Sequence, residues 1–66
     1  MRIEEAIRRT KWFRRAVRAW RSLNSEALQA AMSRLNAKFP PPKGEEHRNI
    51  RLVRLEAWPP ERRVRG

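Results

Sequence analysis

Residues 2–21 repeat apolar and basic side chains with the period of an α-helix. On a helical wheel of about 100° per residue, one face gathers mostly apolar positions: Ile3, Ala6, Ile7, Thr10, Phe13, Ala16, Val17 and Trp20. The opposite face carries Arg8, Lys11, Arg14, Arg15 and Arg18. Glu4 and Glu5 each precede an arginine by four residues, a spacing that stabilises helices. The pattern predicts one amphipathic helix over residues 2–21.

A second apolar stripe follows a short polar break. Residues 22–25 are rich in side chains that cap helices, and we expect Asn24 to be the N-cap, with Glu26 in the first turn. Apolar side chains then recur at three- and four-residue steps: Leu28, Ala31, Met32, Leu35 and Phe39. The prolines at 40–42 end this stripe, because a residue that precedes proline avoids the helical region. The pattern predicts a second helix over about residues 25–38.

The remaining residues favour extended structure. Residues 40–49 begin with three prolines and are otherwise polar, which is typical of a linker. Residues 50–58 are short, rich in β-branched and other apolar side chains, and are closed by prolines, which favours a strand over a helix. A lone strand needs a partner strand from another chain, or it lies extended across the helices.

These patterns predict a mainly α fold. We expect a two-helix amphipathic hairpin over residues 1–39, a Pro-rich linker over 40–49, and an extended basic arm with a possible short strand over 50–66. The apolar faces of the two helices should form the core, with these side chains the most buried: Ile7, Phe13, Val17, Trp20, Leu28, Met32 and Leu35.

The charge of the chain is strongly unbalanced. Lysine and arginine together number 17 against 7 acidic residues, a formal net charge of +10, and the first 21 residues carry eight basic and two acidic side chains. So much charge on a 66-residue body repels itself unless an anion is near. We therefore expect the chain to be ordered only within a larger complex. A GC-rich genome also enriches arginine, so the arginine excess alone does not establish phosphate recognition.

The candidate binding site is a basic stripe on the first predicted helix. Arg8, Lys11, Arg15 and Arg18 follow i, i+3, i+7, i+10 spacing and are flanked by Arg14. Such a stripe can follow a phosphate backbone, although many basic stripes are simply solvated helix faces. Trp12 lies beside it. Its ring either packs within the hairpin or has an exposed role, which is to stack on unpaired bases, to anchor a membrane interface or to fill a partner's pocket. The predicted nucleic-acid-binding residues are Arg8, Lys11, Trp12, Arg14, Arg15, Arg18 and, in the tail, Arg62 and Arg63.

Two functions are favoured, and a third, an amphipathic helix that lies on a membrane surface, is less economical because it leaves the second helix and the arm without a role. The first is a basic accessory protein that binds nucleic acid, either DNA or RNA, or a nucleoprotein particle. The second is a small non-catalytic subunit that docks onto an acidic protein surface of a larger assembly, for example of a phage or a multi-subunit enzyme, through Arg–carboxylate pairs and Trp anchors. Sequence-specific reading of DNA by residues 25–38 is less well supported, because Glu26 occupies the end where base contacts are normally made.

Several classes of chemistry are disfavoured by what the chain lacks. Without cysteine or aspartate, and with His47 as its only histidine, it cannot assemble a disulfide or a typical four-ligand zinc site. Its only glycines are Gly44 and Gly66, so it has no Gly-rich phosphate loop. We therefore expect no enzymatic activity, cofactor or metal. No run reaches the roughly 18 apolar residues of a membrane span, and a secretory signal is missing, so we expect no transmembrane segment and a cytoplasmic location.

Overall fold

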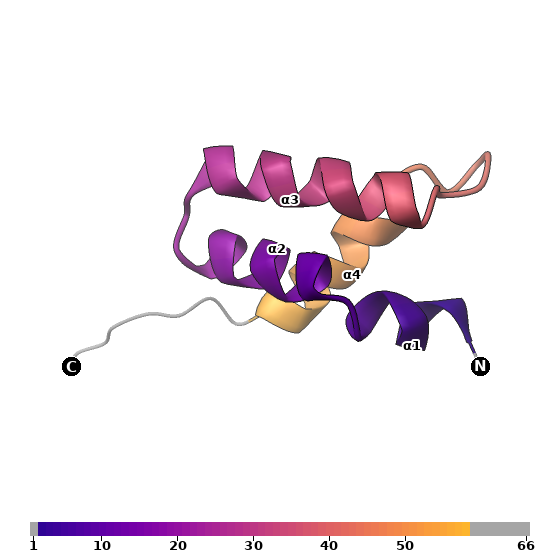
Figure 1. The fold of residues 1–66 in the computed structure, drawn as a ribbon, viewed down its shortest axis with the longest axis horizontal. Coiled ribbons are helices and arrows are strands. Elements are labelled where there is room, and N and C mark those ends of the chain that lie inside the picture. The colour runs from indigo at the N-terminus through magenta and orange to yellow at the C-terminus, as the bar shows by residue number, and fades with distance from the viewer. Residues whose placement is uncertain (1, 59–66) are drawn as a thin grey trace.

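The computed structural model describes residues 2–58, which form four helices (Figure 1). These are α1 (Ile3–Arg8), α2 (Lys11–Arg21), α3 (Ser25–Lys38) and α4 (Arg48–Ala57). No strand occurs within residues 2–58, so the predicted mainly helical class is confirmed. In this part of the chain, no helix has the length and apolar character that crossing a membrane would require.

The helices surround a single core. Helices α2 and α3 run antiparallel and side by side, and α4 packs against both of them (Figure 1). Helix α1 contacts the beginning of the bundle through α2. Helix α2 makes the most extensive contacts of the four helices.

The prediction of a single helix over residues 2–21 is wrong, because the helix is interrupted between Arg8 and Lys11. Thr10 has extended dihedral angles (φ −79°, ψ 152°), and its hydroxyl accepts a hydrogen bond from the amide of Phe13 at 3.2 Å. The same hydroxyl donates to the carbonyl of Ile7 at 2.8 Å. Thr10 thus caps the start of α2 and ties it to the end of α1. The break redirects α1 so that Ile7 is completely buried.

The turn between α2 and α3 is a Schellman motif. The amide of Asn24 donates to the carbonyl of Ala19 at 2.9 Å, and the amide of Leu23 donates to that of Trp20 at 3.1 Å. Leu23 adopts a positive φ of 57°, where glycine is normally preferred. Asn24 then caps α3 by accepting from the amide of Ala27 at 3.1 Å. Helix α3 has the bounds and the N-cap that the sequence predicts.

The predicted strand and extended arm are wrong over residues 50–57, which belong to α4, and residues 59–66 of the predicted arm lie outside the described residues. Seen as a helix, this segment places Asn49, Val53 and Ala57 at four-residue steps, with Leu52 beside them, and all four side chains are buried. The β-branched and bulky apolar residues that favour a strand locally are stabilised in a helix by packing against α2 and α3. The linker is correspondingly shorter than predicted, because residues 48 and 49 belong to the helix.

Residues 40–47 connect α3 to α4 and contain neither helix nor strand. Gly44 turns the chain with a φ of 91°, which only glycine adopts readily. Its amide donates to the carboxylate of Glu46 at 3.1 Å, and this hydrogen bond lowers the pKa of Glu46 below its usual range. The turn brings the chain back to the bundle just before α4 begins.

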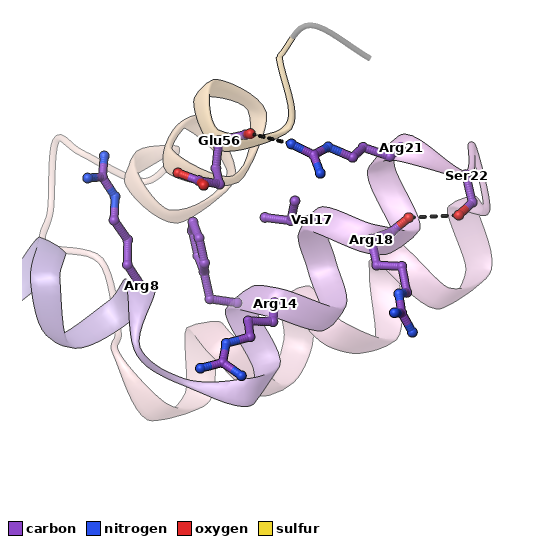
Figure 2. A pocket seen from close by; sticks show the side chains of 8 residues that line it. Arg8, Arg14, Val17, Arg18, Arg21, Ser22 and Glu56 are labelled. Carbon is purple, nitrogen blue, oxygen red and sulfur yellow. Dashed lines mark hydrogen bonds between the residues drawn. The ribbon is translucent and has the colours of Figure 1, made fainter. Parts of the chain in front are cut away.

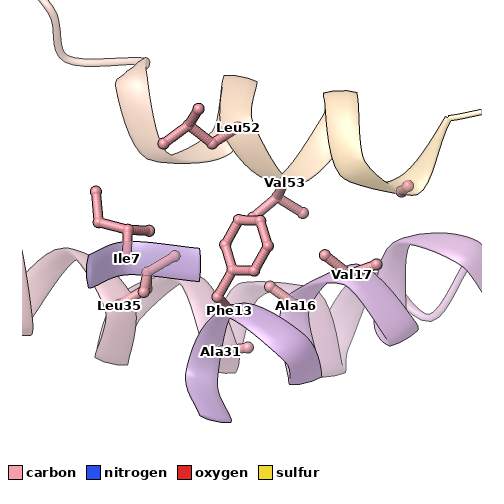
Figure 3. Packing of buried hydrophobic residues seen from close by; sticks show 9 residues of the cluster. Ile7, Phe13, Ala16, Val17, Ala31, Leu35, Leu52 and Val53 are labelled. Atoms are coloured by element: carbon pink, nitrogen blue, oxygen red, sulfur yellow. The ribbon is translucent and has the colours of Figure 1, made fainter. Parts of the chain in front are cut away.

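The core contains side chains from all four helices (Figure 3). The ring of Phe13 points from α2 toward Val53 of α4 in its centre. The buried cluster comprises Ile7, Phe13, Ala16, Val17, Ala31, Leu35, Leu52, Val53 and Ala57. Four of the seven predicted core residues are confirmed as buried: Ile7, Phe13, Val17 and Leu35. The other three are only partly buried, because α4 completes the centre of the core and leaves them at its edge: Trp20, Leu28 and Met32.

A buried polar cluster joins the start of α4 to the end of α3. The side-chain amide of Asn49 donates to Asn36 Oδ1 at 2.7 Å and to the carbonyl of Phe39 at 2.9 Å. Arg48 donates to the same carbonyl at 2.9 Å and to Asn49 Oδ1 at 3.0 Å. The carbonyl at the end of α3 would otherwise lack a partner, and the Arg48 charge is favourable at this negative end of the helix dipole. These bonds hold α4 in place.

A pair of leucine substitutions in α4 tests whether this helix belongs to the core. Leu52 is buried and Leu55 is 59% exposed, although both lie on the same helix. We expect Leu52→Ala to lower the free energy of unfolding by about 2–5 kcal/mol, because it removes packed core volume. Leu55→Ala should change it by no more than about 0.5 kcal/mol. Urea denaturation followed by circular dichroism measures both, and equal stabilities for the two variants would mean that residues 48–57 are not packed on the bundle.

Candidate functional site

The outer face of α2 is densely basic, because its inner face is occupied by the core. Phe13, Ala16, Val17 and Ala19 of this helix are buried. The exposed positions carry five cations, which we call the basic ridge: Lys11, Arg14, Arg15, Arg18 and Arg21. Four of these were predicted as binding residues, whereas Arg21 was missed. Its spacing, three residues after Arg18 and seven after Arg14, was the available signal.

A groove between α2 and α4 runs along one flank of the ridge (Figure 2). Its volume is about 800 Å³. Phe13 and Val17 form an apolar floor that is nearly buried, and Glu56 is the acidic residue of its lining. We call this site the α2–α4 groove. Four arginines surround its floor: Arg8, Arg14, Arg18 and Arg21. In Figure 2, Arg14 and Arg18 extend from α2 on the side away from α4.

Arg8 reaches this groove from a different helix than predicted. The break at Thr10 places Arg8 at the end of α1, so the continuous i, i+3, i+7, i+10 stripe does not exist. The change of direction nevertheless leaves Arg8 at the groove that Arg14 and Arg18 also line. The arginine is thus brought to the site by tertiary structure and not by helical periodicity.

Arg21 is held in position by the end of α4. Its Nη2 donates to the carbonyl of Glu56 at 3.1 Å, and its Nε donates to that of Ala57 at 3.5 Å. These are carbonyls of the last helical turn, which lack partners within the helix and lie at its negative end. The contact joins α2 to α4 and fixes one cation at the rim of the α2–α4 groove (Figure 2).

Trp12 gathers three cations on the other flank of the ridge. The guanidinium carbons of Arg15 and Arg34 lie 4.8 Å and 5.2 Å from the centroid of its ring, and the ammonium of Lys11 lies 5.6 Å from it. Each such cation–π contact is worth about 0.5–1 kcal/mol at an exposed site. The ring is half-buried and packs against the core. The Trp12 ring therefore contacts the core and the three cationic side chains.

Arg34 was missed by sequence reasoning, and no sequence signal identified it. It lies on α3, and only the packing of α3 on α2 brings its guanidinium to the Trp12 ring. Beside this cluster is a second groove of about 360 Å³, which we call the α2–α3 groove. Trp12, Arg15 and Arg18 line it above a floor of small side chains: Ala19, Ala27, Ala30 and Ala31. Arg18 therefore lines both grooves.

The cations of this surface are not neutralised by hydrogen bonds to carboxylates within residues 2–58. The arginine side chains that donate hydrogen bonds there are Arg21 and Arg48, and their acceptors are main-chain carbonyls and the amide oxygen of Asn49. The two predicted tail residues, Arg62 and Arg63, lie outside the described residues.

Comparison with known proteins does not assign the chain to a family. No family model, curated protein or solved structure matches it. The part of the chain that the structure describes also brings no three potential metal-ligating side chains together.

Replacing Trp12 tests whether its ring lies against the side chains of the neighbouring cations. Trp12→Leu keeps an apolar side chain against the core but removes the aromatic face. We expect the side-chain protons of Arg15 and Arg34 to shift toward random-coil values in NMR spectra, because the ring current is lost. Trp58→Leu, which alters an aromatic side chain that is 69% exposed, is the control and should leave those signals unchanged. Unaltered Arg15 and Arg34 signals in the Trp12 variant would contradict the cluster.

Proposed function

We propose that this protein is a small non-catalytic accessory protein that binds nucleic acid, alone or in a nucleoprotein particle, through its phosphate backbone. The observation that carries the proposal is the convergence of seven cations from three helices around α2. They are Arg8, Lys11, Arg14, Arg15, Arg18, Arg21 and Arg34. A nucleic-acid ligand would be met in the cytoplasm, which is the location we propose.

The chemistry of these side chains suits phosphate. Six of the seven are arginines, whose planar guanidinium offers several donors to an oxyanion at once. Closely spaced cations also attract counterions of their own, and a polyanion that replaces those counterions binds with a gain in entropy. A polymer of phosphates satisfies several cations together, whereas a single small anion satisfies one or two. The density of the basic ridge therefore favours a polyanion.

A second candidate is a subunit that docks onto an acidic protein surface. Three apolar side chains favour it by being exposed: Leu23 at 85%, Leu55 at 59% and Trp58 at 69%. Leu23 also has a left-handed backbone, which costs a non-glycine residue about 1–2 kcal/mol. An apolar anchor that enters a partner's pocket would offset this cost. None of these side chains belongs to the basic ridge, so the two functions are separable by mutation.

Salt dependence and two substitutions of Arg15 distinguish the candidates. Fluorescence anisotropy with labelled random-sequence DNA and RNA measures the affinity at several salt concentrations. If Arg15 contacts phosphate, Arg15→Ala should reduce the slope of log affinity against log salt by about 0.9 on duplex DNA or about 0.7 on single strands. Arg15→Lys should retain much of the slope, because the charge remains. Arg51→Ala is the matched control, because Arg51 is an exposed arginine of α4 and lines neither the α2–α4 groove nor the α2–α3 groove.

The subunit alternative leads to the opposite pattern. Bidentate pairing with a carboxylate needs the guanidinium fork, so Arg15→Lys would then weaken partner binding nearly as much as Arg15→Ala. Substituting Leu23 or Trp58 would weaken it too. If the anisotropy of neither labelled DNA nor labelled RNA rises on addition of the protein at low salt, the nucleic-acid proposal is wrong.

A further inference from the structure

We infer that the ligand is duplex DNA, contacted through both of its phosphate backbones, with α2 lying over the major groove. The inference rests on the proposed function and narrows it from nucleic acid in general to one form. It follows from how the cations are distributed on the two sides of α2.

The cations form two rows that flank the same helix. Arg8, Arg14 and Arg21 line the α2–α4 groove, and none of them lines the α2–α3 groove. On the opposite flank, Lys11, Arg15 and Arg34 gather around Trp12. Arg18 lies between the rows, because it lines both grooves. A single phosphate chain can follow one row, whereas two chains are needed to occupy both.

The rows project from the two sides of the exposed arc of α2, and Arg8 on α1 and Arg34 on α3 extend them outward. An α-helix with its side chains is about 10–12 Å across. The major groove of B-form DNA is about 12 Å wide, while the minor groove is about 6 Å wide. Helix α2 is therefore narrow enough to lie over the major groove, with one DNA backbone beside each row of cations.

The surface offers little to an unpaired base. Stacking requires an open aromatic face, but Phe13 is buried and Trp12 is occupied by the core and its cations. The exposed ring of Trp58 lines neither of the two grooves. The hydroxyl of Ser22, just beyond the end of α2, donates a hydrogen bond to the carbonyl of Arg18 at 2.8 Å, so this donor is already used within the protein. The cations of the basic ridge would thus contact phosphates, which carry no sequence information. Arg18, between the two rows, would lie nearest the middle of the DNA major groove.

The same geometry discriminates against duplex RNA. An A-form helix has a deep and narrow major groove that protein side chains do not enter. Helix α2 could not lie within it, so only one row of cations would engage. Duplex DNA, duplex RNA and single strands of one sequence therefore make a sharp comparison.

Anisotropy titrations of the full 66-residue chain with these three labelled probes test the inference. We expect duplex DNA to bind about tenfold or more tightly than either alternative. Its salt slope should be steeper by about 2–3, because the second row adds up to three phosphate contacts of about 0.9 each. Arg14→Ala and Arg15→Ala, one from each row, should each lower the slope on duplex DNA by about 0.9, and the double variant by about twice that. Arg51→Ala should leave it unchanged.

Three outcomes would overturn the inference, and they are distinguishable. Equal or tighter binding of single strands would show that only one backbone is contacted. Equal or tighter binding of duplex RNA would exclude α2 from the major groove. A normal salt slope in Arg14→Ala would show that the row of Arg8, Arg14 and Arg21 does not follow a DNA backbone. In each of these cases the proposed nucleic-acid function stands, whereas failure to bind any of the three probes would overturn both.

Discussion

The burial of one face of α2 against both α3 and α4 is the constraint on which the rest of the structure depends. Phe13, Ala16 and Val17 must face inward, so the charged positions of this helix are confined to the remaining arc. Five cations share that arc, and Arg8 and Arg34 join them from the neighbouring helices. Their mutual repulsion opposes folding, and the polyanion that we propose as ligand would relieve it. The core and the basic surface are thus two consequences of one arrangement.

Helix α4 links these two consequences. Its buried face completes the core around Phe13, and Asn49 fixes its start to the carbonyl that ends α3. Its last carbonyls in turn hold Arg21, and its side chain Glu56 forms part of the α2–α4 groove. A chain limited to α2 and α3 would lack both the second wall of that groove and the anchor for Arg21. The segment interpreted from the sequence as an arm is therefore part of the site.

Strong local signals made part of this structure predictable, and tertiary contacts determine the rest. The Asn24 cap, the apolar stripe after it and the prolines that follow define α3 within the sequence itself. Thr10 was assigned to the interior of a helix, because its capping bonds depend on α1 turning toward the core. Residues 50–58 have a local preference for a strand that packing overrides. The cations of α2 were predicted from periodicity, whereas Arg34 reaches the site only through the packing of α3 on α2.

The most direct test of the account is an NMR titration of the ¹⁵N-labelled protein with a short DNA duplex. The account predicts the largest chemical-shift changes along α2, at the end of α1 and at Arg34, where the cations converge. Arg51 and Arg54, which are equally exposed but lie on another face of α4, should change little. Changes centred on Leu23, Leu55 or Trp58, or spread evenly over every exposed arginine, would contradict the claim that the surface around α2 is the binding site.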